Sequence, residues 1–257
     1  MNVRPLIAFV KCASYATDSI KEAIDHIFSI LGKEKKFWIR GQKVFIKPNL
    51  LTDRLPGQAV TTHPALLRAL VKKIQDDGAY VLIGDSPASV SKIHSVYEKT
   101  GIYSLCKEES VQLVNMEESG SVKFESNGFK FTIAKAALDC DVFINVPKLK
   151  THSLTTITGA VKNLYGTVPG YQKMNLHRDY PNIKEFSQLI NAIAAVIPVK
   201  LNIIDAITDM EGNGPSAGSP KSFQFIAASE DAYELCLLYT SDAADDLLCV
   251  DLGGRRI

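Results

Sequence analysis

Apolar strand-like runs alternate with amphipathic helical segments along most of this chain, and this alternation limits the folds available to it. The run AYVLIGD (79–85) is apolar almost throughout, as expected for a strand covered on both faces. Pro64 and Gly78 stand where the helix between them would begin and end. The pattern predicts an α/β fold in which helices cover both faces of a largely parallel sheet. The expected strands are 5–11, 43–49, 79–85, 141–146, 200–206 and 222–229, and the expected main helices are 18–31, 64–77 and 185–197.

Residues 86–140 follow a less regular pattern. A helix is expected near 90–100, and two alternating runs meet at Ser126-Asn127-Gly128, which is typical of a β-hairpin. Together with the preceding run VQLVN, these runs predict a small excursion from the main sheet around 110–135. Two further segments are expected: a helix near 156–165 and an irregular, mobile stretch at 168–182.

The last residues read as foreign to the gene. Residues 236–245 (CLLYTSDAAD) and 249–257 (CVDLGGRRI) match the direct translation of the two halves of a transposase sequencing adapter, in order and in one reading frame. Residues 246–248 fill the place of a short barcode. We therefore expect a single α/β domain over 1–235 and a non-native tail over 236–257. The natural sequence is expected to be truncated near Leu235.

Composition argues against several classes of protein. The formal net charge of +1 is too small to predict binding to nucleic acids or to a membrane surface. No stretch approaches the roughly 20 apolar residues of a membrane helix, and the N-terminus lacks the features of a signal peptide, so a cytoplasmic protein is expected. Outside the tail, Cys12, Cys106 and Cys140 lie far apart and form no C-x-x-C pair, which argues against a disulfide framework or a zinc site.

Four of the expected strands each end in a compact polar cluster. The carboxyl ends of parallel strands meet at one edge of a sheet, and such sheets bind ligands there. We therefore expect the four clusters to form one binding or catalytic site. The clusters are Lys47 with Asn49; Asp85; Lys148, Lys150, Thr151 and His152; and Asp205 with Glu211.

The stretch DVFINVPKLKTHSLTTITGAVKNLYG carries the strongest signal for a site. Lys148, Lys150 and Lys162 follow a short apolar strand, and lysines are compact charges suited to phosphate or carboxylate groups. Gly159 permits a close backbone approach before the helix that carries Asn163. The chain contains neither G-x-x-x-x-G-K-[ST] nor G-x-G-x-x-G, so a P-loop and a dinucleotide fingerprint are both absent from the sequence.

Three histidines are candidates for chemistry at the same edge. One of His63, His152 and His177 would serve as general acid or base near neutral pH. Asp85 would orient a histidine, bind a hydroxyl group, or cap the helix that follows it. Alternatively, the three histidines would ligate a metal, although they lack an H-x-x-x-H spacing.

With these residues in view, the chain resembles the family called domain of unknown function 362. The resemblance implies an α/β domain, a [4Fe–4S] cofactor in a ferredoxin-like module beside or beyond it, and an electron-transfer partner. The required run of cysteines does not occur in this sequence. The matching pieces are Lys47-Pro48-Asn49, Thr62-His63-Pro64, Gly84-Asp85-Ser86-Pro87, Pro147 through His152, Thr158 through Asn163 with Gly166, His177, and Asp205 through Pro215 with Gly218.

The leading hypothesis is an enzyme that acts on a small anionic substrate and has a link to electron transfer through an iron–sulfur module. Lys47, Lys148, Lys150 and Lys162 would bind the substrate, and His152 or His63 would move a proton. Two alternatives remain open. One is a non-catalytic domain that binds phosphate or a nucleotide, and the other is a metal-dependent enzyme that uses the three histidines.

Overall fold

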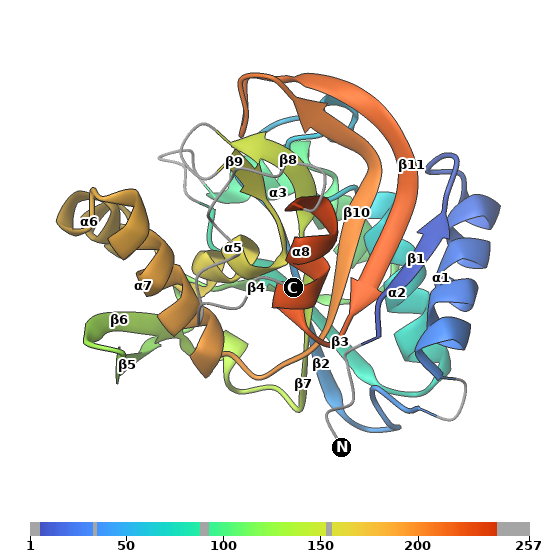
Figure 1. Cartoon of the computed structure of the whole chain (residues 1–257). Helices are drawn as coiled ribbons and strands as arrows, with labels where there is room; N and C mark the ends of the chain where they lie inside the picture. Colours follow the sequence, from blue (N-terminus) through green and yellow to red (C-terminus); the bar gives the residue numbers. More distant parts are fainter. Residues whose placement is uncertain (1–5, 33–34, 88–92, 153–155, 241–257) are drawn as a thin grey trace.

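The computed structural model describes residues 6–32, 35–87, 93–152 and 156–240, and a nine-stranded sheet lies at its centre (Figure 1). Seven strands follow one another across the sheet in the order β1-β11-β10-β7-β2-β3-β4, and β8 and β9 extend it beside β10. The strands of this sheet are β1 (Ala8–Lys11), β2 (Lys43–Pro48), β3 (Tyr80–Asp85), β4 (Gln112–Asn115), β7 (Val142–Val146), β8 (Lys148–His152), β9 (Thr156–Thr158), β10 (Val199–Glu211) and β11 (Ser219–Ser229).

The centre of the sheet is parallel and one edge is antiparallel. Strands β10, β7, β2, β3 and β4 pair in parallel, whereas β11 pairs antiparallel with both β10 and β1. The predicted hairpin is present as a separate two-stranded sheet of β5 (Ser121–Ser126) and β6 (Phe129–Ala134). The predicted α/β class, with a largely parallel sheet and a small hairpin, is therefore confirmed.

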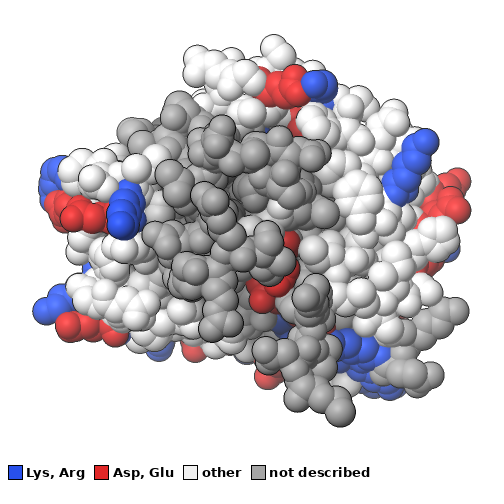
Figure 2. All heavy atoms as spheres, viewed as in Figure 1, with Lys and Arg blue, Asp and Glu red and all other residues white. Residues whose placement is uncertain are grey.

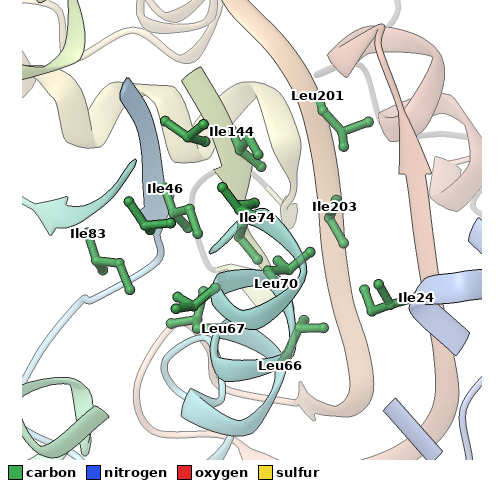
Figure 3. Packing of buried hydrophobic residues seen from close by; sticks show 14 of the residues in the cluster. Ile24, Ile46, Leu66, Leu67, Leu70, Ile74, Ile83, Ile144, Leu201 and Ile203 are labelled. Atoms are coloured by element: carbon green, nitrogen blue, oxygen red, sulfur yellow. The ribbon is translucent and has the colours of Figure 1, made fainter. Parts of the chain in front are cut away.

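Successive residues of the central strands point into two separate cores. Ile46 and Ile144 belong to the core under α1 and α2, whereas Phe45 and Phe143 belong to the core under α5 and α7. Figure 3 shows the first core, in which leucines of α2 face the isoleucines of the sheet. Because both faces are covered, the strands are apolar almost throughout rather than alternating.

Helices α2 and α7 each begin after a residue whose side chain caps the first turn. The side chain of His63 accepts a hydrogen bond from the Ala65 amide ahead of α2, and Pro64 occupies the first turn. Asn182 accepts from the first amides of α7 in the same way. The helices are α1 (Thr17–Gly32), α2 (Pro64–Asp76), α3 (Ile93–Lys99), α4 (Ile102–Glu108), α5 (Ala160–Asn163), α6 (Gln172–Asp179), α7 (Ile183–Val196) and α8 (Ala232–Thr240), with 3-10 turns η1 (Pro56–Gln58), η2 (Lys135–Ala137) and η3 (Leu164–Thr167).

The structure corrects several predicted segments. The run VQLVN is not part of the hairpin, because β4 pairs in parallel with β3 at the edge of the main sheet. The expected helix near 156–165 is instead strand β9, one short turn of α5 and the 3-10 turn η3. The β-branched residues of β9 pair with β8, and this pairing overrides the helical spacing. The stretch 168–182, expected to be irregular, contains helix α6.

The tail expected to be foreign begins inside helix α8. Cys236 is buried in the core under α5 and α7, next to Leu235. Residues 241–257, the rest of the tail expected to be non-native, lie outside the described part of the chain.

Candidate functional site

A cavity of about 180 Å³ opens at the carboxyl ends of β2 and β3. Segments far apart in the sequence supply its walls: the two strand ends, β8, the turn formed by α5 and η3, and helix α6. Its lining residues are Lys47, Asn49, Leu50, Leu51, Asp85, Ser86, Lys150, Thr158, Lys162, Asn163, Tyr165, Gly166, Lys173, Met174, His177 and Pro215.

Lys47 and Asp85 form a buried ion pair at the floor of the cavity. Lys47 Nζ lies 2.7 Å from Asp85 Oδ1, and both side chains are almost completely buried. The Leu50 amide donates to the other carboxylate oxygen at 2.8 Å. Gly166 lies directly against this pair, because a Cβ at this position would lie 2.5 Å from Lys47 Nζ. The pair and the glycine therefore depend on each other sterically.

Three further lysines, Lys150, Lys162 and Lys173, also line the cavity. Lys150 Nζ donates to the Val60 carbonyl at 2.7 Å, and Lys173 Nζ donates to the carbonyl and hydroxyl of Ser86. Burial lowers the pKa of Lys150 to about 7, with help from the charge of Lys148. Burial likewise lowers the pKa of Lys173 to about 8 and, together with Lys150, the pKa of Lys162 to about 6. These amines therefore exchange protons near neutral pH.

A series of hydrogen-bonded asparagine side chains runs from the cavity lining into the sheet. Asn49 Nδ2 donates to Asn163 Oδ1 at 3.1 Å, and Asn163 Nδ2 donates to Asn145 Oδ1 at 2.8 Å. Asn145 Nδ2 then donates to Asn202 Oδ1 at 2.8 Å, across the β7–β10 pair. Asn163 Oδ1 also lies 3.4 Å from Lys47 Nζ. These hydrogen bonds fix the side chain of Asn163, which in turn orients Lys47 and Asn49.

Two polar atoms of the lining are buried without a partner among the described residues. One is the hydroxyl of Thr158, a residue that is 4% exposed, and the other is Asn49 Oδ1. Buried polar groups in folded proteins are normally paired. Both atoms are therefore available to a bound molecule.

A second polar cluster forms around Asp205. Asp205 Oδ1 is 3.0 Å from Lys148 Nζ and accepts from the Tyr15 hydroxyl at 2.7 Å. Asp205 Oδ2 accepts from the His63 amide at 2.8 Å. The Tyr15 and His63 rings stack with centroids 3.7 Å apart. The charge of Lys148 is thus paired with Asp205, and Lys148 is not among the residues that line the cavity with Lys150.

His63 is held as a neutral imidazole in this cluster. Its Nδ1 accepts the Ala65 amide at 3.1 Å, and burial lowers its pKa to about 4. Its ring nitrogen Nδ1 is thus already used by the helix cap. His63 is not among the residues that line the cavity.

Asp209 is the other unusual group near this cluster. It is 2% exposed, and both carboxyl oxygens are buried without a partner among the described residues. Burial raises its pKa to about 8, so the carboxyl is protonated at neutral pH.

The remaining residues expected in the site lie in different places. His177 lines the cavity and stacks on Phe186, with centroids 4.2 Å apart. Thr151 donates instead to the carbonyl of Met210 in β10 at 3.2 Å and to that of Gly212 at 3.0 Å. Glu211 pairs with Lys221 on the surface. The backbone of His152 belongs to β8, but its side chain lies outside the described part of the structure.

Several residues around the two clusters were missed by reasoning from the sequence. Asn145 and Asn202 each interrupt an apolar strand run, and a polar residue in a buried strand could have indicated a functional or hydrogen-bonding role. Lys173 had no signal, because its helix is polar and was read as irregular. Tyr15 also had none, because it precedes α1 in a short connection.

The described cysteines do not fit an iron–sulfur cluster. The free thiols are Cys12, Cys106, Cys140 and Cys236, and burial raises the pKa of the first three, which keeps them protonated. Iron–sulfur clusters are held by several thiolates at one place. Within the described residues, no group of three histidine, cysteine, aspartate or glutamate side chains is placed to hold a metal.

The outer surface shows no concentration of one charge on the face that Figure 2 displays. Described lysines and arginines there are scattered around the rim, and several lie beside acidic residues. No helix among the described residues has both the length and the apolar character needed to cross a bilayer.

Comparisons with known proteins agree with this architecture. A curated relative, "Thylakoid-associated protein sll1697" from Synechocystis sp., is 34% identical over 236 residues, which cover 91% of this chain and 73% of the relative. The solved lactate racemase apoprotein from Thermoanaerobacterium thermosaccharolyticum superposes with a TM-score of 0.55 at 16% identity, covering 91% of this chain but only 56% of that one. At this identity, the likeness concerns the fold alone. The family model described as "Domain of unknown function (DUF362)" matches residues 44–235, and the chain belongs to that family.

Proposed function

We propose that this protein is an enzyme that acts on a small anionic substrate bound in the lysine-lined cavity. One observation carries the proposal: four lysines line a cavity of about 180 Å³, whereas Asp85 is the one carboxylate among its described lining residues. Asp85 pairs with Lys47, whereas the hydrogen bonds printed for Lys150 and Lys173 go to neutral oxygen atoms, and a buried charge without a counter-charge is costly. A negatively charged ligand would supply the missing counter-charges.

Lys162 is the group proposed to transfer a proton. Its pKa of about 6 leaves the amine mainly unprotonated at neutral pH, as a general base requires. His63 is less suited, because its Nδ1 caps α2 and the residue does not line the cavity. Lys47, Lys150 and Lys173 would hold the substrate, and Asn163 would orient Lys47.

One finding from the comparisons is compatible with an enzyme. The protein of known structure with a similar fold is named as a lactate racemase. The curated relative is named only by its association with thylakoids. A link to electron transfer through an iron–sulfur module receives no support from the described cysteines.

The test is conversion of small anions from a cell extract. The anionic fraction is incubated in D₂O with the wild-type protein, with Lys162→Met, or with Lys123→Met, which changes an exposed lysine of β5. Nuclear magnetic resonance spectra then report new products or loss of proton signals. We expect conversion or deuteration with the wild type and Lys123→Met, but not with Lys162→Met.

The alternative, a non-catalytic binding domain, predicts a different outcome. In that case an anion from the extract would bind in a Lys150-dependent manner and be recovered unchanged from all three proteins. Such a result would refute the enzymatic proposal and leave the cavity as a binding site.

A further inference from the structure

We infer that the ligand of the cavity carries a phosphoryl group, with two negative charges and three terminal oxygens, rather than a single carboxylate. This inference rests on the proposed function, because it names the class of substrate for the same cavity. It follows from the charges, the hydrogen-bond donors and the volume of the cavity.

The charges around the cavity call for more than one negative charge on the ligand. Lys47 is neutralised by Asp85 at 2.7 Å. Lys150 and Lys173 donate to neutral oxygens of Val60 and Ser86. A monoanion would balance at most one of these two amines. A phosphoryl group carries a charge of about −1.5 to −2 at neutral pH.

The donors that remain match a group with three oxygens. An ammonium group has three N–H donors. Lys150 uses one of them on Val60, and Lys173 uses two on Ser86. The Thr158 hydroxyl is buried and unpaired. Two donors from Lys150 and one each from Lys173 and Thr158 are therefore available, enough to give each of the three phosphoryl oxygens at least one donor.

The volume limits the rest of the ligand. About 180 Å³ is small beside the roughly 300–1,000 Å³ that ligand pockets usually have. A phosphoryl group and a short carbon body would fill this space, with Leu50, Leu51 and Met174 beside the carbon atoms. A whole nucleotide would not fit inside, so any larger part of a ligand would extend out of the cavity.

Charging of Lys150 would keep Lys162 available as a base. A bound dianion raises the pKa of the nearest ammonium groups. The charge of Lys150 is one of the causes that lower the pKa of Lys162. When the phosphoryl group binds, Lys150 becomes fully charged, and its positive charge opposes protonation of Lys162. Lys162 can therefore remain an unprotonated base while Lys150 and Lys173 hold the phosphoryl group.

The test is isothermal titration of the protein with inorganic phosphate at pH 8.0 and low salt, with acetate and succinate as comparison anions. Repeating the titration in buffers of different ionisation enthalpy measures proton uptake. We expect one phosphate to bind per chain at least tenfold more tightly than acetate or succinate. Because Lys150 and Lys173 are partly neutral at this pH, binding should take up about one proton.

Variants locate the binding and keep the test decisive. Lys150→Met should weaken phosphate binding by about tenfold to a hundredfold and reduce proton uptake, and Thr158→Val should weaken it by about threefold to tenfold. Lys123→Met should bind as the wild type does. Circular dichroism confirms that each variant is folded.

The other outcomes separate this inference from the proposed function. If succinate or acetate binds in a Lys150-dependent manner and phosphate does not, the phosphoryl group is wrong while an anionic substrate still stands. If phosphate binds equally well to Lys150→Met, it binds elsewhere and the inference is refuted. If none of the three anions binds, both this inference and the anion-binding cavity are refuted.

Discussion

Replacing Lys150 by methionine should stabilise the empty protein while it removes anion binding. Lys150 is 2% exposed, and its pKa of about 7 lies well below its ordinary value of 10.5. At pH 7.5 this difference corresponds to a destabilisation of about 4 kcal/mol. Loss of the hydrogen bond to the Val60 carbonyl would offset about 1–2 kcal/mol of the gain. We therefore expect Lys150→Met to raise the free energy of unfolding by about 2–3 kcal/mol.

The pH dependence of this effect follows from the direction of the shift. Below pH 7, Lys150 is charged in both the folded and unfolded states, so its full destabilising effect on the wild type is present. Between about pH 7 and pH 10.5 the unfolded state binds more protons, so the wild type gains stability relative to the variant. The difference between the two proteins should shrink by about 3 kcal/mol from pH 7 to pH 9.5.

Urea unfolding followed by the fluorescence of Trp38 measures both quantities. Trp38 is the single tryptophan of the chain and is buried, so its emission reports loss of the core. Lys123→Met, at an exposed position, should change stability by less than about 0.5 kcal/mol. A variant no more stable than the wild type at pH 7.5, or a difference independent of pH, would refute the view that Lys150 is a desolvated amine.

Three further predictions concern the groups that surround the two clusters. Gly166→Ala should displace Lys47 and lower the free energy of unfolding by about 3–5 kcal/mol in the same urea assay; Gly57→Ala, where no atom lies within 4 Å of the added Cβ, should leave stability unchanged. Asp209→Asn should stabilise the protein by more than about 2 kcal/mol at pH 8 and lose this advantage by pH 4. The reason is that Asp209 ionises readily in the unfolded chain above pH 4, whereas its raised pKa in the folded protein opposes ionisation, so the wild type loses stability as the pH rises. Equal thermal melting points of the two proteins at pH 8 would contradict this. Asn145→Leu should lower the free energy of unfolding by about 2–4 kcal/mol and weaken phosphate binding, since it leaves its amide partners unpaired; unchanged phosphate titration would show that the amide chain does not orient the cavity.

The layered architecture could be predicted because it depends on local patterns. The apolar runs that became β2, β3 and β7 and the stripes of α1, α2 and α7 are visible within a few residues of sequence. Parallel strands place their carboxyl ends at one edge, so Lys47, Asp85 and Lys150 were expected to lie together. In the structure, all three line the cavity.

The partners of individual side chains could not be read in the same way. Lys148 and Lys150 are two residues apart on β8, yet one pairs with Asp205 and the other faces the cavity. Thr151 and Glu211 were grouped with the site and make contacts elsewhere.

The sequence by itself determined the layers of this protein and the edge of the sheet at which its polar residues gather, because hydrophobic periodicity and strand direction are local properties. Only the tertiary structure decided that Lys173 enters the cavity from α6 and that Tyr15 joins Asp205, 190 residues away in the chain. Such partnerships depend on how the connections fold back over the sheet. No short-range pattern of amino acids records that path, since the contacts form between segments whose spacing along the chain is unrelated to their distance in space.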